Sequence, residues 1–166
     1  MLRCECTLGN IAGSLKTMQT RDVKPPPLDH GSWGFNKVTT DDDNVLVIPR
    51  MFSDDDGECR FDRARLPLTV KEYAPPAAPV AVGEPMQVGR CVFMRIPPGW
   101  IGQQHPTPHK QLIVCLAGSV RFIGSGGTTH TLGQGESLID ANTVGPGHIT
   151  EVISDIPFEG YLITLD

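Results

Sequence analysis

The amino-acid sequence predicts an all-β fold, a sandwich or barrel of short strands, and three observations predict it. After residue 60 the apolar residues fall into short runs, and turn residues separate these runs at regular intervals. Glycine (18) and proline (15) are both abundant, and charged residues make up only 20% of the chain. No long stretch of Ala, Glu, Lys and Leu at helical spacing is present.

The predicted strands lie mostly in the C-terminal half of the chain. They cover residues 91–96, 111–116, 119–123, 128–132, 136–140, 149–153 and 161–165. Several of these runs are apolar at consecutive positions, which is typical of strands that are covered on both faces. We therefore expect one sheet to pack on another sheet or on an arm of the chain.

The length of 166 residues suits one domain with an attached arm. We assign residues 1–60 to an irregular N-terminal arm with a short strand at 45–48, and residues 61–166 to the barrel. Met18 is a candidate for the true start of the folded protein. The acidic triplets of the arm are interpreted as solvated loops, because the rest of a calcium-binding loop is missing.

Composition and charge set several function classes aside. The net charge is −5 and the 14 basic residues are scattered, so we expect no nucleic-acid partner. No apolar stretch approaches the ~20 residues that cross a bilayer, so we expect no membrane association. The five cysteines are odd in number and show no Cys-x-x-Cys spacing. This pattern favours a reducing, cytoplasmic setting.

The segment 99–118 carries the strongest indication of a functional site. Side chains alternate along an extended chain, so His105, His109 and Gln111 share one face. The two intervening prolines favour the extended backbone that this requires. His148 follows in a second loop, which leads into a strand. Neutral imidazoles are favoured ligands of transition metals. These four residues are therefore our candidate metal site, and solvated loop histidines are the alternative.

The same two segments resemble the sequence motifs of the cupin superfamily. The residues at corresponding positions of the first motif, 99–118, are Gly99, His105, Gln111 and Gly118, and those of the second, 135–148, are Gly135 and His148. The resemblance covers roughly residues 85–165 and is closest to small single-domain cupins. It implies a double-stranded β-helix, or jelly roll, with its site inside the barrel. It also implies a divalent transition metal such as iron, zinc, nickel or manganese.

Two departures from the family pattern affect this site. Thr107 stands where the family has a second histidine, and Gln111 stands where it has a glutamate. An amide oxygen binds a divalent ion less strongly than a carboxylate, because the Coulombic attraction is lost. His109 has the right parity to replace the missing histidine, which is an inference from alternation and not a match to the family.

Three further residues are candidates for ligand binding or support. Arg95 shares parity with the apolar residues of its run, so it is a candidate partner for a substrate carboxylate, with an internal ion pair or an exposed position as alternatives. Trp100 is a candidate for the pocket floor or for packing at the rim. Asp140 either orients His148 or caps a turn.

Three functions follow as hypotheses. The first is a metal-dependent enzyme that acts on a small organic molecule. Dioxygenase, isomerase and decarboxylase chemistries all occur in similar proteins, and imidazole-rich sites suit the iron of a dioxygenase. The second is a non-catalytic module that binds or senses a small molecule through a degenerate metal site. The third is a structural barrel that serves dimerisation. We expect a homodimer.

Overall fold

The computed structural model describes residues 44–166, which form ten strands and no helix. Residues 1–43, which include Met18 and most of the predicted arm, lie outside the described residues. The all-β fold class predicted from the sequence is confirmed. Among the described residues there is no helix long and apolar enough to cross a membrane.

The strands lie close to the predicted runs. Their bounds are β1 (Val45–Ser53), β2 (Cys59–Lys71), β3 (Val80–Gly83), β4 (Val88–Ile96), β5 (Gln111–Ala117), β6 (Ser119–Gly124), β7 (Thr129–Gly133), β8 (Ser137–Ala141), β9 (His148–Val152) and β10 (Phe158–Leu165). Apolar residues bounded by glycine, proline and polar turns therefore marked the strands of the C-terminal half correctly.

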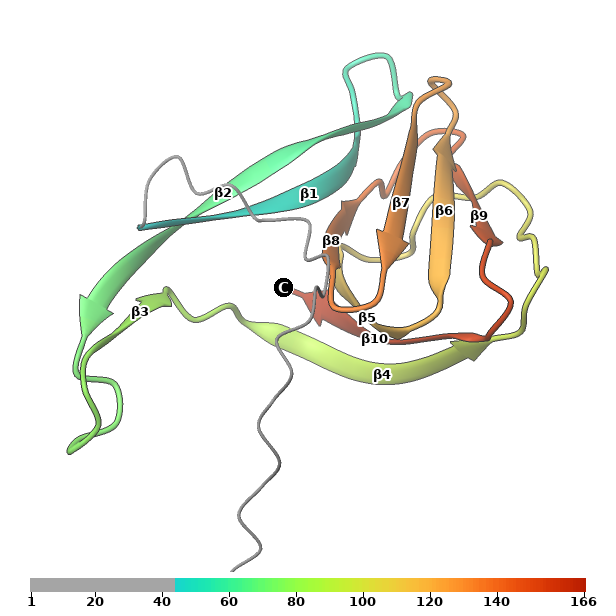
Figure 1. The fold of residues 1–166 in the computed structure, drawn as a ribbon. Helices are drawn as coiled ribbons and strands as arrows, with labels where there is room; N and C mark the ends of the chain where they lie inside the picture. Colours follow the sequence, from blue (N-terminus) through green and yellow to red (C-terminus); the bar gives the residue numbers. More distant parts are fainter. Residues whose placement is uncertain (1–43) are drawn as a thin grey trace, which may run out of the picture. The chain divides into compact units, whose positions relative to one another are not determined.

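The strands form two sheets (Figure 1). The larger sheet has the order β3-β2-β1-β8-β5-β10-β4, and the smaller sheet has the order β7-β6-β9. Strand pairs are antiparallel except for the short parallel pairing of β1 with β8. From β5 onwards the chain passes back and forth between the two sheets. This is the winding of a jelly roll.

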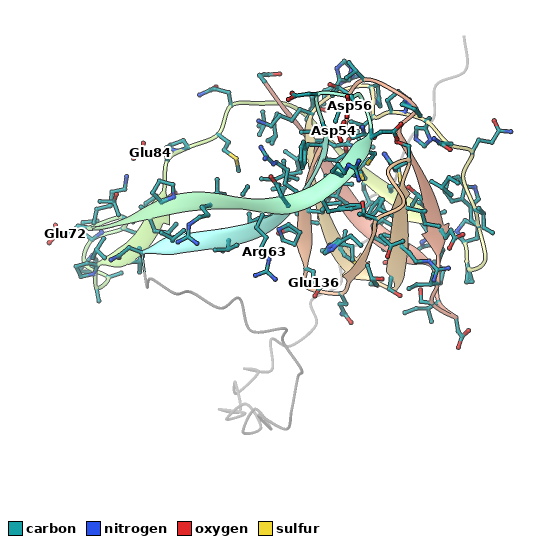
Figure 2. The ribbon with its side chains drawn as sticks, turned by 90° about the horizontal axis from the view of Figure 1, so that it is seen from above. Asp54, Asp56, Arg63, Glu72, Glu84 and Glu136 are labelled. Carbon is teal, nitrogen blue, oxygen red and sulfur yellow. The ribbon has the colours of Figure 1, made fainter. Side chains whose placement is uncertain are left out.

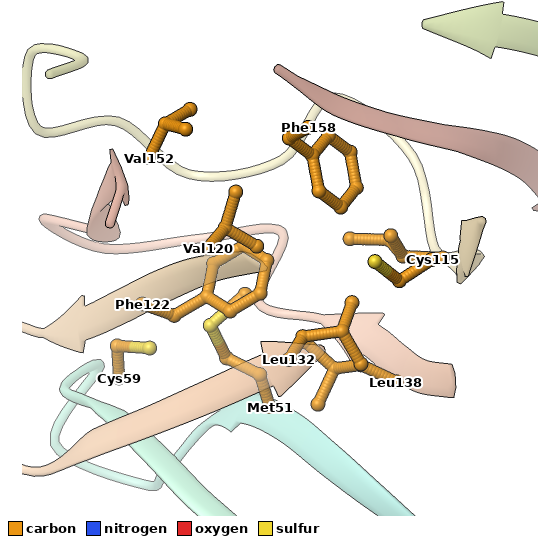
Figure 3. Packing of buried hydrophobic residues seen from close by; sticks show 10 residues of the cluster. Met51, Cys59, Cys115, Val120, Phe122, Leu132, Leu138, Val152 and Phe158 are labelled. Carbon is orange, nitrogen blue, oxygen red and sulfur yellow. The ribbon is translucent and has the colours of Figure 1, made fainter. Parts of the chain in front are cut away.

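Apolar side chains from both sheets meet in one core (Figure 3). Its buried members are Met51, Cys59, Ile113, Cys115, Val120, Phe122, Leu132, Leu138, Val152 and Phe158. Every strand except β3 and β4 contributes to this set. The hydrophobic effect therefore holds the two sheets face to face, as the consecutive apolar runs of the sequence indicated.

Strand β1 belongs to the larger sheet, although the sequence analysis assigned its residues to the arm. The sequence predicted a strand at 45–48, whereas β1 continues to Ser53. It pairs with β2 along its whole length, and residues 50–52 also pair with β8. Met51 is completely buried in the core. The burial of this side chain explains why the strand continues beyond Pro49, a residue that cannot donate a ladder hydrogen bond.

The outer part of β2 forms a hairpin with β3 that extends beyond the rest of the larger sheet. Residues 68–71 of β2 pair with residues 80–83 of β3. Most residues of this hairpin are exposed, and Glu72 lies at its far end in Figure 2. The hairpin adds little to the core, so the site is built by the remaining strands.

Candidate functional site

Two histidines far apart in the sequence face each other across a β-bridge. The backbone N–H of His105 donates to the carbonyl of His148 at 3.1 Å, and the N–H of His148 donates to the carbonyl of His105 at 3.0 Å. Residues that exchange both hydrogen bonds in an antiparallel pair project from the same face. The two imidazoles accordingly lie side by side, with ring centroids 5.2 Å apart.

Gly147 permits this close approach of the two chain segments. Its φ is +84°, and a Cβ built on it would lie 2.0 Å from the backbone carbonyl carbon of His105. No side chain fits at that distance, so only glycine allows the bridge to form. The glycine before His148 is therefore part of the site.

A buried amide fixes the orientation and tautomer of His148. Nδ1 of His148 lies 3.1 Å from Oδ1 of Asn142, whose Nδ2 donates to Oγ of Ser53 at 2.8 Å. Since that amide nitrogen is already donating, its oxygen is the acceptor for His148. Nδ1 of His148 consequently carries the hydrogen, and Nε2 keeps its lone pair.

Burial also keeps His148 neutral. The side chain is 3% exposed. Desolvation by burial, together with the smaller effect of the neighbouring His105, lowers its pKa to about 4. An imidazole in this state has the neutral form that metals bind.

His105 has the same tautomer as His148 but a more open position. Its Nδ1 donates to the carbonyl of Gln103 at 2.7 Å, which leaves Nε2 with a lone pair. The side chain is exposed, whereas His148 is buried. His105 therefore lies toward the mouth of the site and His148 toward its floor.

A buried carboxyl group lies beside the two imidazoles. Asp140 is 1% exposed and accepts hydrogen bonds from the backbone N–H of Asn142 at 3.1 Å and from Nε2 of Gln111 at 3.3 Å. The same Gln111 nitrogen donates to Oγ1 of Thr107 at 2.9 Å. Burial raises the pKa of Asp140 to about 6, against the opposing effect of these hydrogen bonds. Among residues 44–166, no Lys or Arg lines this pocket to pair with Asp140.

These groups form one end of a cavity of about 270 Å³. We call this the polar end, and it consists of His105, Thr107, Gln111, Asp140 and His148. The apolar residues of the lining, which we call the apolar wall, are Met94, Ile96, Ile113, Val120, Phe122, Phe158 and Leu162. Phe122 of this wall packs against His148, with ring centroids 5.8 Å apart. Apart from Thr150 and the indole of Trp100, the hydrogen-bonding side chains of the lining belong to the polar end, so the cavity is amphiphilic.

The structure brings together most of the residues that the sequence singled out. His105, Gln111 and His148 lie at the polar end, and Trp100 lines the pocket with 40% of its surface exposed. Its indole lies over Gly102 and so forms part of the rim. Asp140 lies at the polar end, but Asn142 is the residue that orients His148.

Two predicted residues lie outside the pocket. His109 is exposed and does not line the cavity, because the chain is irregular between His105 and β5 and strict alternation does not hold there. Met94 and Ile96 face the cavity, so Arg95 between them projects from the opposite face of β4. There its Nε donates to Glu159 at 2.7 Å. The parity assumed from the sequence for this strand is therefore reversed.

Sequence reasoning missed the support that Asn142 and Ser53 provide. Asn142 is completely buried, and its contact with Ser53 joins segments 89 residues apart. No local pattern in the sequence marks either residue. The signal appears only when β1 is placed beside β8.

The donors present fit a divalent transition metal in part. Within residues 44–166, no three His, Cys, Asp or Glu side chains are grouped closely enough to hold a metal ion. The two imidazoles, whose ring centroids lie 5.2 Å apart, are the donors that would hold such an ion.

Comparisons with known proteins find distant similarities in structure. No family model and no curated protein matches the chain. A structure search finds a cupin domain from Bordetella pertussis with 19% identity and a TM-score of 0.40, which covers 61% of this chain and 93% of that one. It also finds a cupin 2 conserved barrel protein from Salinispora arenicola with 18% identity and a TM-score of 0.36, covering 61% of this chain and 76% of that one.

A third similar structure is the Cnp3 cupin domain of Schizosaccharomyces pombe, with 10% identity and a TM-score of 0.37, covering 74% of this chain and 85% of that one. At these values the similarities carry no argument about chemistry. The winding of the strands between two sheets itself defines the fold as a jelly roll, as predicted from the sequence. The assignment to the cupin superfamily stays a prediction.

Proposed function

We propose that the cavity binds a small organic molecule beside a divalent transition metal held by His105 and His148. One observation carries the proposal: two imidazoles on the same face of a β-bridge each use Nδ1 as a donor, which leaves both Nε2 lone pairs available. Hydrogen-bonded Nδ1 atoms are typical of histidines that bind metals through Nε2. Iron, zinc, nickel and manganese are the ions that we consider.

The surrounding residues would serve such a site in defined ways. Asn142 holds the ring of His148 in place, and burial keeps that ring unprotonated. Asp140 supplies a negative charge that no Lys or Arg in the pocket offsets, so a bound cation would lower its pKa. When bound, the ion supplies a Lewis acid next to the apolar wall. Turnover with and without oxygen would separate a dioxygenase from an isomerase or a decarboxylase.

A specific observation favours a second candidate function, a metal-free binding module. Among the described residues the site offers only two metal-binding imidazoles and no grouped third His, Cys, Asp or Glu ligand. The amide nitrogen of Gln111 is engaged with Thr107 and Asp140, which holds this side chain in a hydrogen-bond network. In this candidate the polar end only binds the head group of a ligand.

Metal analysis of the full chain, purified without a histidine tag, tests the proposal. We expect a stoichiometric transition metal, or its uptake in calorimetric titrations with Zn²⁺, Ni²⁺, Mn²⁺ and Fe²⁺. His148→Ala should abolish uptake, because it removes one of the two imidazoles of the site. His109→Ala is the matched control and should bind normally, since His109 lies outside the cavity. A wild-type protein that takes up no ion would leave the metal-free binding module as the function.

A further inference from the structure

We propose that the ligand of this cavity is an amphiphilic molecule with one polar head group and an uncharged apolar body about the size of one ring. The inference rests on the proposed binding function and specifies its ligand class. The cavity volume of about 270 Å³ sets the size. It equals the volume of about nine water molecules at ~30 Å³ each in the liquid.

Strand alternation keeps charges out of the body of the cavity. Val120 and Phe122 line the cavity, so Arg121 between them faces outward, where its Nε donates to Glu151 at 2.9 Å. Glu151 itself follows Thr150, a residue of β9 that lines the cavity, so it too faces outward.

The same rule holds on the larger sheet. Met94 and Ile96 of β4 face the cavity, and Arg95 between them bonds to Glu159 of β10 on the outer face. The charged residues of these lining strands thus pair with each other outside. Within the described part of the chain, Asp140 is the one ionisable carboxyl group that lines the cavity.

Apart from the hydroxyl of Thr150, which pairs across the sheet with Phe122, the side chains of the apolar wall offer no hydrogen-bonding partner. Val120, Phe122 and Phe158 are 1%, 4% and 2% exposed. The backbone groups of β5, β6 and β10 are engaged in the ladders of their sheets. A polar group of a ligand placed against this wall would lose its water and gain no partner, which is unfavourable.

The polar end offers the opposite environment. The Nε2 lone pairs of His105 and His148 and the carboxyl group of Asp140 belong to this end. The wall begins directly beside it, because the ring centroid of Phe122 lies 5.8 Å from that of His148. One head group of the ligand is satisfied at this end, directly or through a bound ion. Molecules with polar groups all around them, such as sugars, nucleotides, amino acids and dicarboxylates, are excluded by the wall.

A matched pair of alcohols tests this ligand class. 4-Ethylbenzyl alcohol and 1,4-benzenedimethanol have the same number of non-hydrogen atoms and the same head group. They differ only in a methyl group or a hydroxyl group at the far end of the ring. In NMR titrations of the full chain as purified, we expect the diol to bind at least about tenfold more weakly, because its second hydroxyl loses its hydrogen bonds at the wall.

A variant of the wall provides the second measurement. Met94→Gln places an amide in the wall at a half-buried position that tolerates it, and should reduce the preference for the ethyl compound to less than about threefold. Val92→Gln is the matched control, because Val92 lies on the same strand, is 50% exposed and does not line the cavity. It should keep the wild-type preference.

The outcomes separate the two proposals. Equal binding of the two alcohols to the wild-type protein overturns the inference and leaves the proposed binding function standing. A preference that Met94→Gln does not change overturns the assignment of the far end of the ligand to the apolar wall. Failure of both alcohols to bind overturns the inference together with the proposed binding function.

Discussion

Substitution of Gly147 by alanine should open the bridge that holds the two histidines together. The residue has a φ of +84°, and a Cβ there would lie 2.0 Å from the carbonyl carbon of His105 and 2.3 Å from the nitrogen of Pro106. Both contacts are to backbone atoms, so no side-chain movement relieves them. The segments around His105 and His148 must therefore separate.

The magnitude has two parts. A left-handed backbone conformation costs any residue other than glycine about 1–2 kcal/mol. Separation of the segments also removes the two hydrogen bonds between His105 and His148. Each contributes about 1 kcal/mol. We therefore expect Gly147→Ala to lower the free energy of unfolding by about 3–4 kcal/mol, and to weaken ligand or metal binding because the imidazoles no longer face one cavity.

Gly135→Ala is a matched control for this substitution. Gly135 has a nearly identical φ of +81°, but a Cβ there has nothing within 4 Å. Only the conformational part remains, a loss of about 1–2 kcal/mol. Urea unfolding followed by circular dichroism, with the slope checked for two-state behaviour, measures both variants. Equal losses of stability in the two variants would refute the argument that crowding against His105 makes Gly147 special.

Two further predictions concern buried ionisable groups in the metal-free protein. The folded-state pKa of Asp140 is about 6, above its ordinary 3.8, so the folded protein binds the proton first as the pH falls. Wild type should gain about 2 kcal/mol of stability relative to Asp140→Asn between pH 8 and pH 4, and a constant difference in urea unfolding would contradict this. The folded-state pKa of His148 is about 4, below its ordinary 6.5, so the unfolded protein binds the proton first as the pH falls. Wild type should therefore lose about 3 kcal/mol of stability relative to His148→Gln as the pH falls from 7 to 4. Burial raises the pKa values of Cys59 and Cys115 to about 11, whereas Cys91 is exposed. Iodoacetamide at pH 8 should label Cys91 in the folded protein and label Cys59 and Cys115 only after unfolding, as detected by peptide mass spectrometry. Rapid labelling of Cys115 in the folded state would show that β5 is not packed as described.

Much of the fold could be predicted because short apolar runs between turn residues are a local signal. The strands β4 to β10 lie close to the runs that the sequence marked. The first strand of the barrel was harder to predict from the sequence. Met51 belongs to the core although its neighbours Pro49 and Arg50 resemble a loop, and only the pairing of β1 with β2 and β8 shows this. Such pairings join residues that are distant in the chain, so no local pattern of the sequence indicates them.

The candidate site could likewise be predicted from the sequence only in part. Parity along one segment correctly placed His105 and Gln111 at the same end of the cavity. It failed for His109, because the backbone leaves the extended form before that residue. It also failed for Arg95, because a one-residue change of register exchanges the inner and outer faces of a strand.

The sequence by itself determined that this chain folds as a small all-β jelly roll and that His105 and His148 are the residues to examine. Turn chemistry, apolar runs and two short motifs are local properties of the chain. Only the tertiary structure decided that the two imidazoles share a bridge, that Asn142 sets the tautomer of one of them, and that Asp140 lies buried beside them. These relations depend on strand pairing across dozens of residues, and the free energy that fixes that pairing comes from the burial of the whole core and not from any single segment.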